Sequence, residues 1–424
     1  MGNRTLPAPG LTPVDLTDHD VFVEGVPHEW FAWLRRHEPV SFTPEPGGRG
    51  FWSVTRHADI VEVSRDWRTF SSQTGATALE DLAPDALAAR LSMLDADPPL
   101  HTHLRRSVTH PFTQRAVAGY EQQVRQVVTE VLDDALVADE FDFVDEIAVK
   151  VPIRVLCRIL GVPEGDEPLI VELSDKLIAN TDPELTDVLF GGADSDDYRL
   201  LPFRNPAALD VHAYGQELAE RKRREPDASL VSQLVHGLNG RRPLTGRDFD
   251  AMFLLLAVAG NETTRSGLSL GLDALIDHPD QWNRLRANRS EAFVKSATDE
   301  LLRYTTPLHH FRRTATVDTV LGGQRIEAGD KVVVWYPSGN RDETVFTAPH
   351  RLDLARTPNP QLAFGRGGPH RCLGEHLALL EIRIVLQELL QRVTGFERTG
   401  PARRVRSNFV NGLKTLPVAV TGRS

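Results

Sequence analysis

The segment that decides the interpretation of this chain is Phe364–Gly374, which reads FGRGGPHRCLG. Its glycines allow tight backbone turns and let a flat ligand approach the main chain closely. Directly after it, apolar residues recur at helical spacing from about Leu373 to Val393 and predict a helix. The start of a helix offers free backbone N–H groups and a positive dipole end, and both favour a thiolate. We therefore expect Cys372 to be a ligand or a reactive group.

Cys157 and Cys372 are the only two cysteines and lie far apart. They form no disulfide framework, which favours a reducing compartment. Cys157 stands in the apolar run Val155–Leu160 and is predicted to be a small buried side chain. His370, Cys372 and His376 suggest a zinc site as an alternative, although their spacing matches no common structural zinc pattern. A cysteine thiolate is also a strongly electron-donating ligand of haem iron.

A long helix is predicted upstream, from Gly246 to Asp277, with a length of about 48 Å. Thr245 and Asp248 fit a capping box at its start, and His278-Pro279 marks its end. Its middle is apolar on nearly all sides, so the helix should cross the interior. The polar run Asn261–Thr264 lies inside that apolar stretch. Buried polar groups are costly unless they are paired or used, so this run is a candidate functional site.

The cysteine segment resembles the haem-binding loop of the cytochrome P450 family, whose usual pattern is Phe-Gly-x-Gly-x-His-x-Cys-x-Gly. Here one residue is inserted around Gly367-Gly368, while His370 to Gly374 stay in register. The resemblance implies that Cys372 is the axial ligand of the iron of haem b. It also implies that Phe364 packs against the haem, a role that the insertion puts in question.

The polar run of the long helix, within Ala259–Thr264 (AGNETT), resembles the oxygen-activation motif of the same family. The resemblance implies that Ala259 and Gly260 leave room beside the iron for dioxygen. Thr263 would then hydrogen-bond to bound oxygen or water, and Glu262 would relay protons from solvent. A helix kink or a satisfied polar core is the alternative explanation of the same residues.

Other family motifs follow. Glu300 and Arg303 are neighbours at i,i+3 on a predicted helix, and the resemblance implies a buried structural role that Arg351 completes.

Haem propionates need cations or hydrogen-bond donors. Asp97, a possible N-cap, precedes a predicted helix that runs to about Leu136 with a break at His110-Pro111. By resemblance, the residues expected to bind the propionates are His101, Arg105, Arg313 and His370.

The expected fold is mainly α (α+β): the triangular helical P450 fold with a smaller β-rich part, and the haem between the long helix and the cysteine loop. One haem-binding domain is expected over 1–424, and the resemblance covers about 11–420. Strands are predicted at Gly50–Val54 and Lys331–Tyr336, with a hairpin at Gly322-Gly323. The tail Asn408–Val420 is predicted to form a strand, a turn around Asn411-Gly412 and a second strand.

Composition narrows the class of protein. The formal net charge is −11, which argues against a nucleic-acid binder. The first 25 residues lack the apolar core of a signal peptide. The longest apolar stretch, Ala251–Gly260, is about half of what a membrane span needs. We expect a cytoplasmic protein without a membrane anchor.

The resemblance implies a monooxygenase that acts on a mostly apolar small molecule with O2. Its electrons would come from a ferredoxin and the NAD(P)H reductase of that ferredoxin, both separate proteins. Two alternatives remain: a peroxide-driven enzyme or isomerase, and a haem carrier or sensor without catalysis. Glu262 and Thr263 argue against both, because neither needs an acid–alcohol pair. The residues that form the predicted docking face for an acidic redox partner are Arg106, Arg115, Arg366 and Arg371.

The substrate is predicted only as a class. Several stretches look closest to the branch that hydroxylates steroid side chains and branched fatty chains, and a biosynthetic intermediate, free or bound to a carrier protein, is the alternative. The pocket should include the loops 71–94 and 184–206. His309 and His310 lie near it and face the substrate, a propionate or solvent. The single residues predicted to line it are Ala259, Leu308, Phe409 and Val410.

Overall fold

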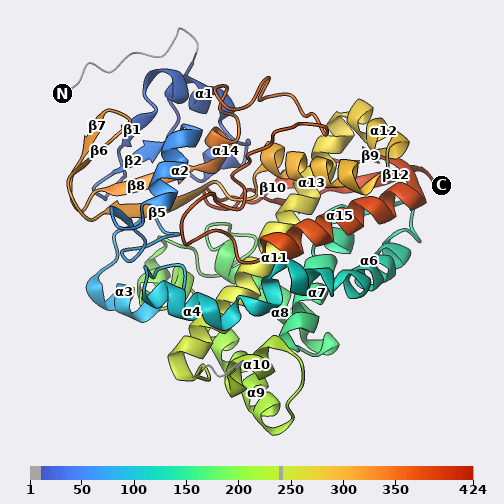
Figure 1. The fold of residues 1–424 in the computed structure, drawn as a ribbon, viewed down its shortest axis with the longest axis horizontal. Coiled ribbons are helices and arrows are strands. Elements are labelled where there is room, and N and C mark those ends of the chain that lie inside the picture. The colour runs from blue at the N-terminus through green and yellow to red at the C-terminus, as the bar shows by residue number, and fades with distance from the viewer. Residues whose placement is uncertain (1–10, 238–241, 424) are drawn as a thin grey trace.

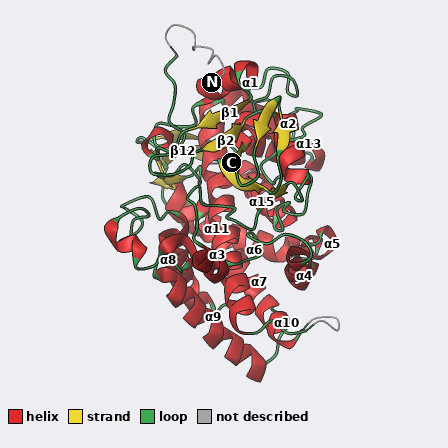
Figure 2. Ribbon diagram, turned by 90° about the vertical axis from the view of Figure 1, so that its left-hand side faces the viewer, coloured by secondary structure: helices red, strands yellow, loops and turns green. Residues whose placement is uncertain are grey.

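A computed structural model describes residues 11–237 and 242–423. Helices form the larger part of the molecule; β1, β2 and β8 lie near α1, whereas β9 and β12 lie on the other side, near α12 and the C-terminus (Figure 1, Figure 2). The α-helices are α1 (His28–His37), α2 (His57–Arg65), α3 (Pro84–Arg90), α4 (Leu100–Val108), α5 (Gln114–Ala118), α6 (Glu121–Ala135), α7 (Lys150–Leu160), α8 (Glu167–Ile178), α9 (Ala207–Arg224), α10 (Leu230–His236), α11 (Gly246–Asp277), α12 (Pro279–Ala287), α13 (Glu291–Thr305), α14 (Tyr336–Gly339) and α15 (Glu375–Arg392). The predicted mainly helical class is confirmed.

The long helix α11 has the predicted bounds and runs through the middle of the molecule, with α7, α8, α9, α13 and α15 packed around it (Figure 1). Its apolar middle is buried, as predicted for a helix that crosses the interior. The predicted capping box is wrong: Thr245 is the N-cap residue, but its side chain accepts no hydrogen bond from the helix. Gly246 enters the helix with a φ of 52°, so the chain does not approach along the direction that a capping box requires.

The strands form one five-stranded sheet and three small ones. The large sheet has the order β1-β2-β8-β5-β3, with β2 parallel to β8 and β5 antiparallel to β8. The predicted strands at β2 and β8 and the hairpin β6–β7 are confirmed. The strands are β1 (Val40–Thr43), β2 (Phe51–Val54), β3 (Phe70–Ser71), β4 (Glu140–Asp142), β5 (His310–Ala315), β6 (Thr319–Leu321), β7 (Gln324–Ile326), β8 (Lys331–Trp335), β9 (Val393–Arg398), β10 (Arg403–Arg404), β11 (Leu413–Thr415) and β12 (Pro417–Arg423).

The C-terminal tail turns back over the start of β5. β11 follows Asn411-Gly412 as predicted, and β12 then joins β9 and β4. The predicted strand from Asn408 is wrong: its partner β10 lies at 403–404, because residues 408–410 form the turn, where the Ser407 hydroxyl accepts from the backbone N–H groups of Phe409 and Val410. An isolated antiparallel bridge joins Leu308 to Val410. The backbone N–H of His309 also donates to the carbonyl of Phe409, at 2.8 Å. These contacts place the 407–412 turn beside the first residues of β5.

The helix α4 and the break after it are as predicted, because a 3-10 turn at His110–Phe112 separates α4 from α5. Asp97 is not a side-chain cap of α4. Its carboxylate instead accepts hydrogen bonds from the Ser71 hydroxyl at 2.6 Å and the Ser72 backbone N–H at 3.1 Å. Asp97 therefore ties the end of β3 to the start of α4. Within the ranges that the structure describes, no helix is both long and apolar enough to span a membrane.

Candidate active site

A cavity of about 740 Å³ lies between α11 and the cysteine loop. Its size is within the range of roughly 300–1,000 Å³ that is usual for small-molecule sites. Leu308 and Phe409 line it, as predicted. Val410 does not: it is buried in the core, where its bridge to Leu308 holds the turn in place. The residues from the two facing walls that meet at this cavity are Ala259, Gly260 and Thr263 on α11, and Phe364 and Cys372 in the loop.

The Cys372 side chain is open to the cavity while protein surrounds it on the other sides. Its backbone N–H donates to the carbonyl of Phe364, at 2.8 Å, which closes the loop on itself. Burial raises the pKa of the thiol to about 11. The backbone N–H groups of Gly374 and Glu375 hydrogen-bond to the sulfur and have the opposite, smaller effect on the pKa. A metal ion deprotonates a coordinating thiol, so a cation in the cavity would reverse this balance.

The part of the cysteine loop that contains the inserted residue, around Gly367-Gly368, packs against α2. Gly365, Gly367 and Gly368 have φ values of 68°, 79° and 67°, which side chains rarely adopt. A Cβ atom on Gly368 would lie 1.8 Å from the carbonyl oxygen of Ser64, in the last turn of α2. The loop is therefore packed against α2 at a point where only glycine fits.

The four predicted propionate ligands gather at the cavity wall. The rings of His101 and His370 are 4.4 Å apart, and Nε2 of His101 is buried without a hydrogen-bond partner. Burial, with the nearby Arg105 and Arg313, lowers the pKa of His101 to about 4 and of His370 to about 2. Among the described residues, no carboxylate forms a hydrogen bond or ion pair with these four side chains. Clustered donors of this kind fit an anionic group such as haem propionates.

Thr263 lies on the cavity side of α11, where its hydroxyl donates to the carbonyl of Ala259 at 3.0 Å. Gly260 lines the cavity, as predicted. A Cβ atom on Gly260 would lie 3.1 Å from the side chain of Leu156, which lines the cavity as well. Its missing side chain therefore also lets α11 pack closely against α7.

Glu262 points away from Thr263 into a buried charged group. Its carboxylate lies 3.2 Å from Nη1 of Arg265, and the same nitrogen lies 2.8 Å from Asp175 of α8. Burial raises the pKa of Glu262 to about 7; Arg265 opposes this shift and Asp175 adds to it. The side chain of Asp175 is 18% exposed and that of Glu262 only 3%. Asp175 and Arg265 were not predicted from the sequence, although the i,i+3 spacing of Arg265 from Glu262 indicates that the two side chains are neighbours.

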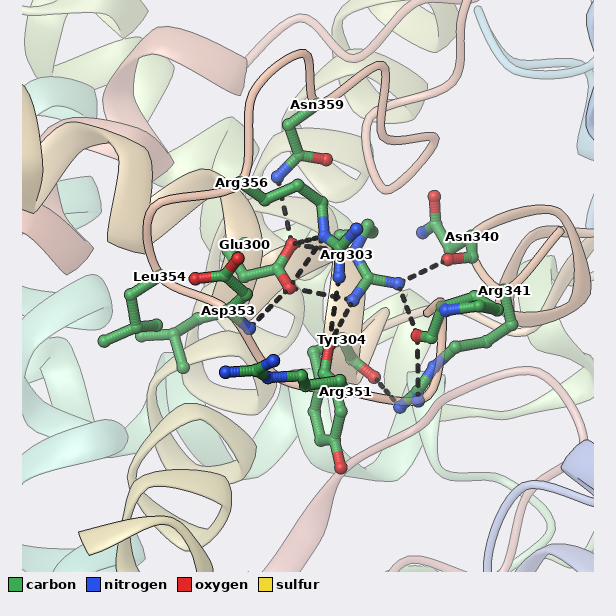
Figure 3. Close-up of polar contacts among 12 residues, drawn as sticks. Glu300, Arg303, Tyr304, Asn340, Arg341, Arg351, Asp353, Leu354, Arg356 and Asn359 are labelled. Atoms are coloured by element: carbon green, nitrogen blue, oxygen red, sulfur yellow. Dashed lines mark hydrogen bonds and ion pairs between the residues drawn. The ribbon is translucent and has the colours of Figure 1, made fainter. Parts of the chain in front are cut away.

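Glu300 and Arg303 form a second buried group, away from the cavity (Figure 3). Arg303 donates to both carboxylate oxygens of Glu300, at 2.7 and 2.8 Å. The predicted third partner is wrong: the guanidinium of Arg356, not Arg351, contacts Glu300 at 3.0 Å. Arg351 contributes only its backbone carbonyl, which accepts from Arg303 and Arg356. The loop that follows Arg351 turns back to Glu300, so the later arginine reaches it.

The alternative zinc ligands do not come together. Over the part of the chain that is described, no group of three or more His, Cys, Asp or Glu side chains is placed to hold a metal ion. His370 is directed to Ser72 and His101, and Cys372 faces the cavity.

Comparison with known proteins assigns the family. The cytochrome P450 family model matches residues 9–401. The chain is 34% identical to a steroid C26-monooxygenase of Rhodococcus jostii, over 95% of this chain and 84% of the relative. It is 36% identical to a methyl-branched lipid omega-hydroxylase of Mycobacterium tuberculosis, over 92% of this chain and 90% of the relative. A cytochrome P450 of Mycobacterium marinum, solved with pseudoionone, superposes with a TM-score of 0.85 at 36% identity, covering 98% of this chain and all of that one.

The residues at the cavity fit the cofactor that this family carries, haem b. A cysteine opens on one wall, small and hydroxyl side chains lie on the other, and cationic side chains without carboxylate partners lie at the edge. The sequence, the fold and the cavity agree, and the chain belongs to the cytochrome P450 family of haem-dependent monooxygenases.

Proposed function

We propose that this protein, as one haem-binding domain, hydroxylates a mostly apolar small molecule, with a steroid side chain or a methyl-branched fatty chain as the substrate class. The observation that carries the proposal is the position of Cys372 across a single cavity from Thr263 and Ala259. Leu308, Phe409 and further apolar side chains line the remaining wall. The two relatives act on steroids and methyl-branched lipids by their names, which supports the same class here.

Haem b, when bound, supplies the iron chemistry that activates dioxygen for insertion into a C–H bond. Cys372 would hold the iron as a thiolate. His101, Arg105, Arg313 and His370 would hold the propionates by charge and hydrogen bonds. Phe364 lies in the same wall as Cys372 and would pack against the haem.

Proton delivery is assigned to α11 and α8. Glu262 holds a proton near neutral pH because burial raises its pKa to about 7. Asp175 is partly exposed and reaches the same guanidinium of Arg265, so protons can enter from solvent through Asp175. The hydroxyl of Thr263 donates its hydrogen bond to the Ala259 carbonyl. Its oxygen can still accept a hydrogen bond from a water molecule in the cavity. A side chain in this position contributes about 10²- to 10⁴-fold to a proton-dependent step.

Electrons are proposed to come from a ferredoxin through its NAD(P)H reductase. Arg106, Arg115 and Arg366 are exposed and form no ion pair with any other described residue, so they remain available to an acidic partner. Arg371 is also exposed, but it is paired with Glu375 at 2.6 Å. Electron transfer to the wild-type protein should therefore slow at high salt. At low salt, Arg366→Glu should slow electron transfer more than Arg371→Glu does.

The test of the proposed function is the carbon monoxide difference spectrum of the reduced, haem-loaded protein. Thiolate ligation by Cys372 should give a strongly red-shifted Soret band that is absent from Cys372→Ala. Cys157→Ala is the matched control: Cys157 is buried in α7, outside the cavity, and should keep the shifted band. A shifted band in Cys372→Ala, or its loss only in Cys157→Ala, would contradict the assignment.

A further inference from the structure

His310, at the start of β5, lines the cavity and has no role in the chemistry described above. Its ring is packed edge-on against Trp335 at 5.1 Å and lies 5.4 Å from the ring of Phe409. Both ring nitrogens are buried without a hydrogen-bond partner. The adjacent His309 differs, because its ring packs on Phe22 at 4.5 Å and does not line the cavity.

An imidazole buried without a partner destabilises the folded protein, so such a group in a native structure calls for an explanation. An apolar side chain would fill the space between Trp335 and Phe409 without this cost. A partner that arrives with the ligand removes the cost when the cavity is filled. The position of His310 in the cavity wall makes the substrate the source of that partner.

A second imidazole, that of His19, lines the same cavity. Its Nδ1 accepts a hydrogen bond from the backbone N–H of Asn408 at 3.2 Å, so the neutral ring carries its proton on Nε2. Nε2 has no other partner among the described residues and can donate. Burial lowers the pKa of His310 to about 3, with a smaller effect of His19, and lowers that of His19 to about 4. Both rings are therefore neutral at physiological pH.

The charged side chains that line the cavity determine which polar group of a substrate can bind beside His310 and His19. Arg90 and Arg204, two further cavity residues, share the carboxylate of Glu80, at 3.0 and 2.6 Å. Arg247 also lines the cavity, and its guanidinium donates to the carbonyl of Ala88 without an ion pair among the described residues. Within the described part of the chain, none of these three arginines forms a hydrogen bond with His310 or His19. Two neutral imidazoles favour an oxygen without charge, because a carboxylate would lose its hydration and gain no opposite charge.

We propose that His310 and His19 form a recognition site for an uncharged oxygen, a hydroxyl or a carbonyl, on an otherwise apolar substrate. The proposal rests on the proposed function insofar as this cavity is the substrate cavity. An oxygen held there fixes one end of the substrate and thereby selects which carbon lies near Thr263.

The test compares two probes with one carbon skeleton: pseudoionone, a ketone, and the hydrocarbon with CH2 in place of its carbonyl. Their dissociation constants are measured on the haem-loaded protein by the change in haem absorbance and by calorimetry. Wild-type protein should bind the ketone more tightly, by about 3- to 10-fold, the effect of one hydrogen bond. His310→Leu should bring this ratio near one, while His310→Gln, which keeps a donor and an acceptor, should preserve it. His309→Leu is the matched control and should also preserve it.

A wild-type ratio near one overturns the proposal, even if His310→Leu fails to fold. An unchanged ratio in folded His310→Leu overturns it as well. Tighter binding of the carboxylic acid of the same skeleton than of the ketone overturns the assignment to an uncharged oxygen. The outcome is separable from that of the proposed function. The carbon monoxide spectrum tests whether Cys372 ligates the iron, whereas calorimetry measures the ratio of the two dissociation constants whichever residue ligates the iron.

Discussion

A glutamate and an arginine at i,i+3 occur on a buried helix twice in this protein, once on α13 and once on α11. Glu300 receives hydrogen bonds from two guanidinium groups, from the Asn359 amide and from a backbone N–H (Figure 3). Glu262 lies 3.2 Å from an arginine that also serves Asp175, and its carboxyl group also contacts that of Asp175. Nε of this arginine has no partner among the described residues.

The difference lies in the ratio of charges. Around Glu300 there are two cations for one carboxylate, and both carboxylate oxygens accept hydrogen bonds from them. Around Arg265 there are two carboxylates for one cation, so one carboxylate tends to hold a proton. Identical spacing therefore gives a fully hydrogen-bonded pair in one place and, in the other, a carboxyl group with a raised pKa, for which we propose proton exchange.

The largest effect is expected for Glu300→Gln. Breaking a buried ion pair leaves Arg303 and Arg356 without their counter-charge, and this should lower the free energy of unfolding by about 3–5 kcal/mol. Denaturant unfolding measures the change, and the yield of haem-loaded protein should fall with it. Asp318→Asn is the control, since it breaks the exposed ion pair with Arg325 and should leave the unfolding midpoint unchanged. Equal midpoints for both variants would remove the distinction between the pairs.

Glu262→Gln should leave the fold intact and impair the chemistry. The amide keeps the shape of the protonated carboxyl but cannot transfer a proton, so product formation should fall about 100-fold or more. The measurement is product formed per reductant consumed, together with the unfolding midpoint. If this variant unfolds as readily as Glu300→Gln while the folded fraction keeps full activity, the α11 group is structural.

The pH dependence of stability should separate the two groups further. The folded protein raises the pKa of Glu262 from 4.5 to about 7, so between these values the folded state holds a proton that the unfolded state has lost. The free energy of unfolding should therefore fall as pH rises from about 4.5 to about 7. Unfolding curves across this range should show a smaller fall for Glu262→Gln, and parallel curves for both proteins would argue against a raised pKa.

Asp175→Asn should give the smallest effect. It leaves one carboxylate for one cation, so the pKa of Glu262 should move down towards its ordinary value. We expect a roughly tenfold slower proton-dependent step and a pH–rate profile displaced to lower pH. Lys176→Gln is the control, because it removes the neighbouring exposed pair with Glu172. A profile that is displaced equally in both variants would show a general charge effect.

Local sequence predicted much of this protein. The end of α11 follows from His278-Pro279, and its start was located correctly although the predicted capping box at Thr245 and Asp248 does not form. The cysteine loop was identified from its own residues. What failed depends on contacts between distant segments. Arg356 follows the predicted partner Arg351 closely in the sequence. Only the path of the loop shows which of the two side chains reaches Glu300. Asp175 meets Arg265 from another helix, 90 residues away along the chain, and no local pattern marks it.

The extra glycine in the cysteine loop has a consequence for chimeric enzymes. Because Gly368 lies directly against the Ser64 carbonyl, the longer loop and the last turn of α2 form a matched pair of surfaces. A shorter loop transplanted from another family member would leave a gap beside α2, and this longer loop placed in such a host would collide with it. Loop and helix should therefore be exchanged together when the haem pocket of this protein is recombined with others.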